Sequence, residues 1–271
     1  MKVDMHMHTT CSDGSLTPDD LVQYAVEQEL RLIAITDHHS VEGLLSLKDS
    51  YPEQLQIIPG IEINTSNHRE LHILGYDLDI RSSVLHRFLS KLSHSSLRAN
   101  MKLQECLRQQ GISLDVSGYK GQAAFRRNLA YALMEQGLCS SREEANVLYL
   151  DYRQHHITPP YKPTAQESIQ IIRDAGGIAV LAHPGRLERH EINIVEVVEE
   201  LIFYGLEGLE CYHPSHSSEQ QQRYVALASE KGLYRSGGSD FHHKEHTDTG
   251  IKSSSQTWWL DSSKINILDA L

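Results

Sequence analysis

Cysteine, long apolar runs and positive charge are all scarce in this sequence. Its 271 residues include only four cysteines, which stand far apart and form no Cys-x-x-Cys pair: Cys11, Cys106, Cys139 and Cys211. A disulfide scaffold is therefore not expected, and a reducing, cytoplasmic location is predicted. No apolar run reaches the ~18 residues of a membrane-spanning helix. The opening MKVDMHMHTT lacks the apolar segment of a secretion signal.

Basic residues are outnumbered by acidic ones. Lys and Arg total 25 against 36 Asp and Glu, which gives a formal net charge of −11 with histidine neutral. Long nucleic acids and anionic membranes are held through basic faces, so this balance excludes a general attachment of that kind. Histidine, by contrast, is abundant, with 17 copies. Imidazole and carboxylate together form the ligand set of zinc, manganese and iron.

Short apolar runs alternate with helical patterns along most of the chain. Seven runs have the length and composition of buried strands: residues 3–7, 32–36, 56–63, 71–76, 178–182, 207–212 and 233–236. Most are separated by helical patterns, such as residues 17–30, which open on Thr17 and Pro18 as a helix start does. This order predicts βαβ units and an α/β fold with a parallel sheet or barrel.

The alternation stops between residues 81 and 163, where no strand pattern occurs. Three helical patterns fill this stretch, at residues 82–110, 123–136 and 141–150. We therefore predict a barrel domain formed by residues 1–80 and 164–271, with a helical insert at residues 81–163. One large domain with an insert is also what the length of the chain allows.

Metal-ligand residue types fall in or directly after the predicted strands. His6 and His8 lie two apart on the first strand and so share one face. The full set is His6, His8, Asp13, His38, Glu62, His72, His183, His213, His216, Asp240 and His242. In a β/α barrel the strand ends meet at one face, where active sites lie. The sequence therefore predicts one convergent metal site.

Other acids and histidines have less specific positions. Asp4 and Asp37 are candidates either to bind a metal or to support a ligand from behind. Seven histidines lack a strand-end context and are expected to be ordinary surface or core residues: His68, His86, His94, His155, His156, His190 and His246.

The strand-end residues stand in six ordered motifs, and with them the chain resembles the polymerase-and-histidinol-phosphatase (PHP) superfamily over most of its length. The motifs are His6-Met7-His8, Thr36-Asp37-His38, Pro59-Gly60-Ile61-Glu62, His72-Ile73-Leu74-Gly75-Tyr76, Ala182-His183-Pro184-Gly185 and Gly238-Ser239-Asp240-Phe241-His242. The chain looks like the branch of small metal-dependent phosphoesterases that hydrolyse nucleoside 3′,5′-bisphosphates and, in some members, the 5′ ends of short RNA. Two positions depart from that branch: His39 replaces an aspartate, and Asn128 replaces a histidine of the insert.

The resemblance implies a distorted seven-stranded (β/α) barrel with a helical insert domain and two or three divalent metal ions. One ion would take His6, His8, Glu62 and Asp240. A second would share Glu62 and add His72 and His183, and a third would take Asp13, His38 and His242. Some relatives carry histidine in place of Asp13. The harder oxygen donor favours manganese or iron at that ion, with zinc or magnesium as alternatives.

The expected chemistry is hydrolysis of a phosphomonoester by a metal-bound hydroxide, because bound metal lowers the pKa of water. His213 and His216 are candidates to protonate the leaving oxygen, although a loop turn with solvated rings explains them equally well. Basic residues that suit the substrate phosphates are Arg126, Arg127, Lys162, Arg186 and Lys244. Arg186, three residues after His183, is the preferred one.

The favoured function is release of the 3′-phosphate from nucleoside 3′,5′-bisphosphates, with a small phosphorylated metabolite or nucleotide as the partner. The alternatives are a 5′–3′ exoribonuclease on short RNA, a histidinol-phosphate phosphatase, and a non-catalytic metal-binding regulatory module. Long nucleic acid is not expected, since each phosphate contact needs a cation. A regulatory module would be expected to have lost some ligands, whereas all nine candidates are present here.

Overall fold

The structure is a computed structural model that describes residues 1–47, 54–117, 126–242 and 258–271. The chain divides into two compact units. The first comprises Met1–His86 and Pro163–Leu271, and the second comprises Arg87–Lys162. Each unit is described by itself below.

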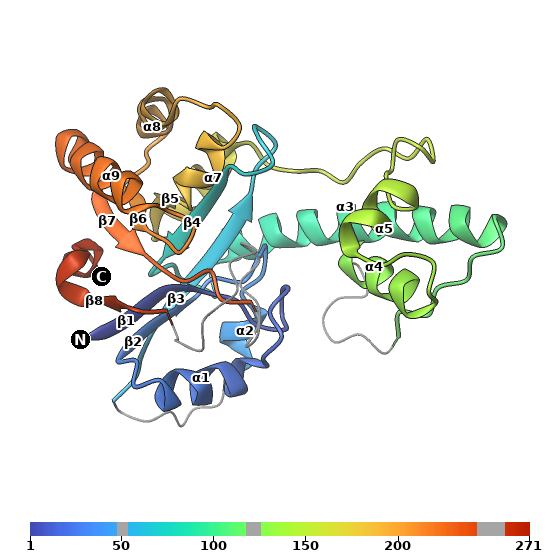
Figure 1. The fold of residues 1–271 in the computed structure, drawn as a ribbon, viewed down its shortest axis with the longest axis horizontal. Helices are drawn as coiled ribbons and strands as arrows, with labels where there is room; N and C mark the ends of the chain where they lie inside the picture. The colour runs from blue at the N-terminus through green and yellow to red at the C-terminus, as the bar shows by residue number, and fades with distance from the viewer. Residues whose placement is uncertain (48–53, 118–125, 243–257) are drawn as a thin grey trace. The chain divides into compact units, whose positions relative to one another are not determined.

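The first unit is built around one sheet of eight strands that curls into a nearly closed barrel (Figure 1). The strands are β1 (Lys2–Met7), β2 (Leu32–Ile35), β3 (Gln56–Asn64), β4 (His72–Tyr76), β5 (Ile178–Leu181), β6 (Gly208–Tyr212), β7 (Tyr234–Gly237) and β8 (Leu260–Asp261). Their order is β7-β6-β5-β4-β3-β2-β1-β8. The α/β barrel predicted from the sequence is confirmed. The two-residue β8, which pairs antiparallel with β1, is an addition to the seven expected strands.

The direction of β4 differs from the parallel order that the sequence suggested. It runs antiparallel to both β3 and β5, whereas β1–β2, β2–β3, β5–β6 and β6–β7 are parallel. Residues 65–71 between β3 and β4 are too few for the helical crossover that a parallel pair requires. The reversal brings His72, at the start of β4, opposite Asn64, at the end of β3.

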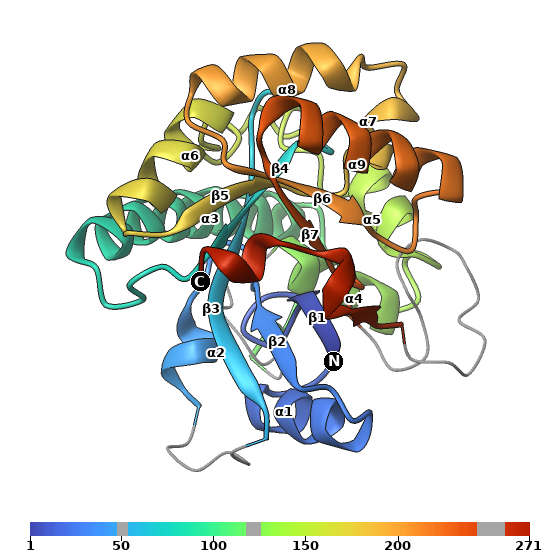
Figure 2. The same cartoon turned by 90° about the vertical axis from the view of Figure 1, so that its left-hand side faces the viewer.

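Helices flank the barrel on two sides. They are α1 (Pro18–Glu27), α2 (Glu42–Leu45), α6 (Ala165–Asp174), α7 (Pro184–Glu188), α8 (Ile194–Phe203) and α9 (Ser218–Lys231), followed by two 3₁₀ turns at Ser262–Lys264 and Ile267–Asp269. Figure 2 shows α1 on one side of the sheet and α6, α8 and α9 on the other. The Thr17 hydroxyl caps α1, and capping boxes built on Thr164 and Ser217 begin α6 and α9.

A bulge in β1 sets the direction of the first two histidines. Asp4 pairs with Ile33 and Met7 with Ile35, so β1 has one residue more than β2 between these pairs. The bulge shifts the side-chain alternation by one position. His6 and His8 consequently fall on the same face as Val3, which packs in the apolar cluster inside the barrel.

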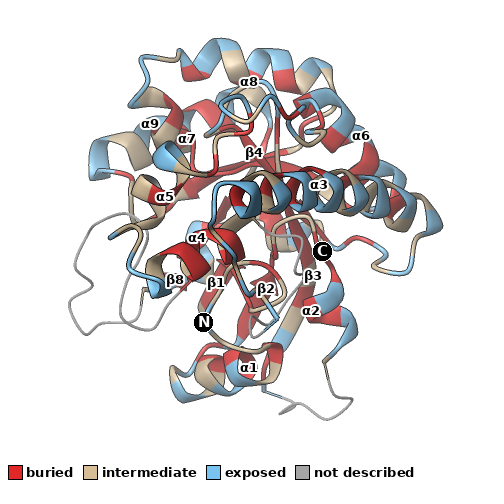
Figure 3. Ribbon diagram, turned by 90° about the vertical axis from the view of Figure 1, so that its right-hand side faces the viewer, coloured by how far each residue is buried: buried red, intermediate tan, exposed pale blue. Residues whose placement is uncertain are grey.

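The barrel closes where the segment after β7 meets β1. The Phe241 carbonyl accepts the His8 N–H at 2.9 Å, the His6 carbonyl accepts the Phe241 N–H at 3.3 Å, and Met7 and Phe241 form an isolated bridge. Figure 3 shows the buried backbone of the strands at the centre of this unit. The closure places residues 6–8 beside residues 240–242.

The second unit is helical. It contains most of α3 (Ser83–Gln109) together with α4 (Arg126–Glu135) and α5 (Arg142–Leu148). Its own core gathers Leu103, Leu107, Leu129 and Leu133. Residues 123–125 of the second predicted helix lie outside the described residues. Across the described ranges, the structure contains no helix that combines the length and apolarity needed to span a bilayer.

Gly238 lies where the chain after β7 crosses β1. A Cβ here would overlap the backbone nitrogen of His6, so we expect Gly238→Ala to destabilise the protein by about 3 kcal/mol and to displace His6. Urea unfolding measures the loss. Gly232→Ala is the control, because it meets open space and costs only the strain of a left-handed backbone, about 1 kcal/mol. Equal losses in the two variants would contradict the close approach.

Candidate metal centre

Glu62, near the end of β3, lies at the centre of the site. Its Oε2 atom is 3.1 Å from His6 Nε2, 3.2 Å from His8 Nε2 and 3.2 Å from His38 Nδ1. The three rings come from β1 and from the loops after β1 and β2, and Glu62 and His6 are buried. One carboxylate oxygen therefore faces three imidazole nitrogens from other parts of the sheet.

The other oxygen of Glu62 faces two further rings. Its Oε1 atom is 2.8 Å from His72 Nδ1 and 3.0 Å from His183 Nε2. His72 begins β4 and His183 follows β5, so the reversal of β4 is what brings His72 to this edge. Glu62 thus has the geometry of a bridge between two groups of ligands.

Asp240, just after β7, forms a second carboxylate centre. Its Oδ1 atom lies 3.2 Å from His8 Nε2 and 3.4 Å from His6 Nε2. Its Oδ2 atom accepts a hydrogen bond of 2.5 Å from Arg186 and lies 3.6 Å from His213 Nε2. One face of Asp240 is therefore turned to the imidazoles and the other to a guanidinium.

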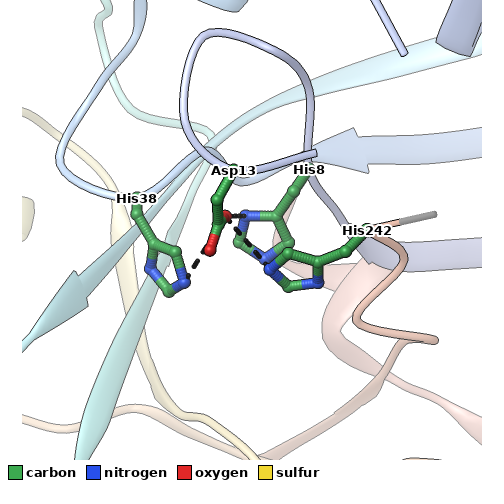
Figure 4. Close-up of side chains that lie close together, drawn as sticks. All are labelled: His8, Asp13, His38 and His242. Atoms are coloured by element: carbon green, nitrogen blue, oxygen red, sulfur yellow. Dashed lines mark ion pairs between the residues drawn. The ribbon is translucent and has the colours of Figure 1, made fainter. Parts of the chain in front are cut away.

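Asp13 gathers a third group, which Figure 4 shows in close-up. Its Oδ1 atom is 3.1 Å from His242 Nε2, 3.8 Å from His8 Nδ1 and 3.9 Å from His38 Nε2. The Asp13 side chain is 23% exposed and that of His38 is 21% exposed. This group consequently lies at the solvent-facing side of the site.

Three of these sets have the proximity that a metal ion requires. In each, the ligand atoms all lie within 4.8 Å of one another. The sets are His6, His8, Glu62 and Asp240; His8, Asp13, His38 and His242; and His38, Glu62 and His72. The grouping that the family resemblance implied differs in three places: it placed His183 with Glu62 and His72, it kept His8 to the first ion, and it kept His38 to the third.

Unpartnered buried atoms show that divalent cations fit the site. Within the described residues, His8 Nε2, Asp13 Oδ1, His38 Nδ1 and Asp240 Oδ1 are buried and have no hydrogen-bond partner. Buried polar atoms normally have a hydrogen-bond partner. Each of these four atoms belongs to a residue of the three sets. Imidazole nitrogen and carboxylate oxygen are donors that manganese, iron and zinc accept. The donor set therefore fits metal ions of this kind.

The charge states suit cations as well. Burial opposes ionisation of Glu62, but the surrounding histidines hold its pKa well below the ordinary value. Burial likewise opposes ionisation of Asp240, and Arg186 and His6 outweigh it, so that its pKa also lies well below the ordinary value. Both carboxylates stay anionic at neutral pH. The same negative field appears at His242, where Asp13 and Asp240 overcome burial and raise the pKa to about 10, so this part of the site attracts positive charge that a metal ion would replace.

Main-chain carbonyls fix two of the rings from behind. His72 Nε2 donates to the Arg69 carbonyl at 2.9 Å, which leaves Nδ1 as the nitrogen that faces Glu62. His242 Nδ1 donates to the Asp240 carbonyl at 2.9 Å, which leaves Nε2 for Asp13. Such outer hydrogen bonds fix the tautomer of a metal-binding histidine.

Glu210, in the middle of β6, is a residue of the site that sequence reasoning missed. It is fully buried, its Oε1 atom lies 3.0 Å from His6 Nδ1, and its Oε2 atom accepts the His183 N–H at 2.6 Å. The feature of the sequence that could have revealed it is an acidic residue inside the apolar run 207–212. His183 has a left-handed backbone with φ of 27°, a costly conformation that surrounding contacts must enforce. Glu210 thus orients one ring and holds a second residue in a strained conformation.

Glu210→Gln should lower metal affinity about 10–100-fold, because the amide cannot accept both hydrogen bonds as the carboxylate does. Competition with a chelator, read as bound metal per chain, measures the loss. Glu207→Gln is the matched control, since Glu207 lies three residues earlier, is partly exposed and pairs with Arg173. Unchanged metal binding in Glu210→Gln would refute the role.

The two proposed proton donors differ in their surroundings. His216 Nε2 accepts the Gly185 N–H at 3.1 Å and its Nδ1 donates to the Cys211 carbonyl at 3.1 Å, so the main chain occupies both nitrogens. Burial lowers the pKa of His216 to about 3. His213 Nδ1 accepts the Ser215 N–H at 3.0 Å, which leaves its Nε2 directed toward Asp240. Of the two histidines, it is His213 that presents a ring nitrogen to the site.

The predicted cationic residues lie in different parts of the chain. Arg186, in α7, contacts Asp240 and is 18% exposed, so it lies at the centre itself. Arg126 and Arg127 begin α4 of the helical unit, where Arg126 lies 5.3 Å from the Tyr152 ring. Burial and the charge of Arg126 lower the pKa of Lys162 in the same unit. Lys244 lies outside the described residues.

Asp37 and Asp4, which the sequence left open as metal ligands or as supports of a ligand, both accept hydrogen bonds from residues near the ligands. Asp37 accepts hydrogen bonds from the Thr9 N–H and hydroxyl and from the Ser12 hydroxyl, which shapes the loop that carries Asp13. Asp4 accepts the N–H groups of His6 and Ser239. It therefore supports the backbone of His6, whereas the sequence predicted that it would support the ring of His6 or His8.

The two positions that depart from the family pattern also have defined places. The His39 N–H donates to the Glu62 carbonyl at 3.0 Å, and its Nε2 accepts the Asn64 N–H at 3.0 Å, so it braces the end of β3. Asn128 is buried within α4 of the helical unit.

Grouped imidazoles and carboxylates able to hold several divalent ions, set at the strand ends of an α/β barrel, define a metal-dependent hydrolase. A PHP domain model matches residues 4–158. The 5′-3′ exoribonuclease Rnm of Escherichia coli is 33% identical over 248 residues, which cover 88% of this chain and 84% of that protein. The 3′,5′-nucleoside bisphosphate phosphatase of Chromobacterium violaceum is 28% identical, and the match covers 89% of this chain and 87% of that protein.

A solved structure agrees with these relatives. A protein from Bifidobacterium adolescentis assigned to the metal-dependent phosphoesterases superposes with a TM-score of 0.76 at 26% identity, covering 97% of this chain and 93% of that one. The chain therefore belongs to the PHP family and is a metal-dependent phosphoesterase.

Proposed function

We propose that the protein releases the 3′-phosphate of nucleoside 3′,5′-bisphosphates. The observation that carries the proposal is the convergence of six imidazole side chains around the carboxylates of Glu62, Asp240 and Asp13, with Arg186 beside them. A phosphomonoester brings about two negative charges at neutral pH, which this combination of donors and guanidinium suits. The Chromobacterium relative that carries this activity in its name supports the choice of substrate.

Nine residues are proposed as the metal ligands: His6, His8, Asp13, His38, Glu62, His72, His183, Asp240 and His242. Bound divalent ions would neutralise phosphoryl charge and make water acidic enough to attack at neutral pH. The oxygen donor of Asp13 makes the set with His38 and His242 harder, which favours manganese or iron over zinc at that ion.

The chain's own residues supply orientation and a proton. The Arg186 guanidinium, held by Asp240 at 2.5 Å, is placed to donate to a phosphoryl oxygen through its remaining N–H groups. His213 holds a proton on Nε2, because its Nδ1 accepts the Ser215 N–H. We therefore favour His213 over His216 as the group that donates from Nε2 to the leaving oxygen. Arg126 and Arg127 are still proposed as the residues that bind a second phosphate of the substrate.

A 5′–3′ exoribonuclease acting on short RNA is the second candidate. It is favoured by the 33% identity to the Escherichia coli exoribonuclease over most of both chains. The two activities share the donor set and differ in the ester that is cleaved, a phosphomonoester or a phosphodiester. The net charge of −11 favours short strands over long ones in either case.

A panel of three substrates separates the candidates. The purified protein with added manganese is offered 3′-phosphoadenosine 5′-phosphate, a 5′-phosphorylated oligoribonucleotide and histidinol phosphate, and release of phosphate or mononucleotide is measured. We expect fastest turnover of the bisphosphate. Faster release of mononucleotide from the oligoribonucleotide would favour the exoribonuclease, and turnover of histidinol phosphate alone would refute both nucleotide candidates. Bound metal without any turnover would leave a regulatory module.

A further inference from the structure

Three planar side chains gather beside the metal centre, and for the two histidines among them the sequence predicted ordinary surface or core residues. His68 and Arg69 lie in the loop between β3 and β4, and His190 follows α7, which that loop passes (Figure 1). The His68 and His190 ring centroids are 5.0 Å apart, with planes inclined at 57°. Arg69 Nη2 lies 3.4 Å from His190 Nε2. We call these three residues the rim cluster.

The rim cluster is joined directly to the metal centre by its backbone. The Arg69 carbonyl accepts the hydrogen bond from His72 Nε2 at 2.9 Å, and His72 faces Glu62 through its other nitrogen. The rim cluster is therefore one ring and one peptide away from Glu62.

Charge also connects the two places. Arg69 pairs with Glu70 at 3.1 Å. Burial works against the charge of Arg186, but Asp240, Glu62 and Glu70 together raise the pKa of its guanidinium. Glu70 thus pairs with the arginine of the rim cluster and acts electrostatically on the arginine that contacts Asp240.

The faces of the rim cluster are available to a ligand. His190 is exposed, and the Arg69 side chain is 72% exposed. The Glu70 N–H donates to His68 Nδ1 at 3.1 Å, which holds that ring in place. Nucleobases that are not paired stack on histidine rings and on arginine guanidinium planes. An oriented ring, a second ring and a guanidinium side by side match that mode of recognition.

We propose that His68, Arg69 and His190 form the subsite for the nucleobase of the substrate, whose scissile phosphate lies at the metal centre. The proposal rests on the proposed function, since it requires a nucleotide substrate. The proposal places the nucleobase on the barrel unit. In it, these three residues determine substrate specificity, and hydrolysis takes place at the centre around Glu62.

The test compares a substrate with a base and one without. Values of kcat and KM are measured for adenosine 3′,5′-bisphosphate and for the matching abasic sugar bisphosphate, in the wild type and in Arg69→Ala and His190→Ala. We expect each variant to reduce the preference for the base-bearing substrate, taken as the ratio of kcat/KM values, about tenfold or more. The reduction should arise in KM. Arg173→Ala is the control, because Arg173 also pairs with a glutamate and should keep the ratio.

The remaining outcomes decide against the subsite. An unchanged ratio, or a parallel loss on both substrates with less bound metal, would show that these residues only support His72. If the wild type hydrolyses neither bisphosphate, the proposed function fails, and calorimetry of adenosine 5′-monophosphate and ribose 5-phosphate binding then tests the subsite. Tighter binding of the nucleotide that Arg69→Ala abolishes would support the subsite, and equal binding of the two ligands by the wild type would refute it.

Discussion

Glu62→Gln should reduce phosphoesterase activity at least ~10³-fold, because one carboxylate serves rings from several strands and loops of the barrel. Its two oxygens lie within 3.2 Å of His6, His8, His38, His72 and His183. The amide keeps the volume of the side chain but removes the anionic bridge. Phosphate release and bound metal per chain, measured together, should both fall.

Glu207→Gln provides the control for this variant. It removes the charge of a partly exposed glutamate on the neighbouring part of the barrel without touching the donor sets. Circular dichroism and thermal unfolding establish that both variants fold. A folded Glu62→Gln protein with nearly normal turnover would show that the ligand assignment is wrong.

Metal removal should have an effect of similar size. Dialysis against a chelator should abolish turnover, and manganese or iron should restore it. If metal at ~1,000 times its dissociation constant binds only the folded chain, it adds about 4 kcal/mol of stability. For a chain of this size that corresponds to a fall of roughly 10 °C in the unfolding temperature on chelation. Calorimetric scans of the chelated and reloaded protein measure it.

Asp13 provides the test of metal preference. Protein purified untagged and without added metal should contain manganese or iron at the group that Asp13 forms with His38 and His242. Asp13→His, which introduces a softer donor at the same place, should shift the bound metal toward zinc. Full zinc occupancy in the wild type would overturn the preference.

Much of the barrel could be predicted because its strands are short apolar runs with a polar residue at the end. Leu32 to Ile35 and Ile178 to Leu181 have this form, and chance alone would scatter ligand types over helix faces as well as strand ends. Strand direction was harder to predict. The reversal of β4 follows from the short connection 65–71, a local detail that the alternation of strands and helices hides.

The residues that the sequence did not reveal act through tertiary contacts. Glu210 lies in the middle of β6, and its meaning depends on His6 and His183, which are far away in the chain. The bulge in β1 changes which face His6 occupies, and no residue type marks it. His213 and His216 looked equivalent in the sequence, because only the fold decides which ring has both nitrogens hydrogen-bonded to the main chain.

The closure between β1 and the segment after β7 gives the metal ions a mechanical role. The strand order ends at β7 on one side and at β1 and β8 on the other, and the hydrogen bonds described across that seam gather at Ser239 and Phe241. His6 and His8 stand on one side of the seam, and Asp240 and His242 on the other. A metal ion bound by both sides would act as a cross-link that closes a loop of roughly two hundred residues, and cross-links of long loops restrict the unfolded chain most.

The ligands on the far side of the seam are also among the last parts of the barrel to leave the ribosome, since synthesis runs from the amino end. A nascent chain therefore cannot complete the donor set until residue 242 has emerged. Metal capture would then coincide with closure of the barrel between β1 and the segment that carries Asp240 and His242.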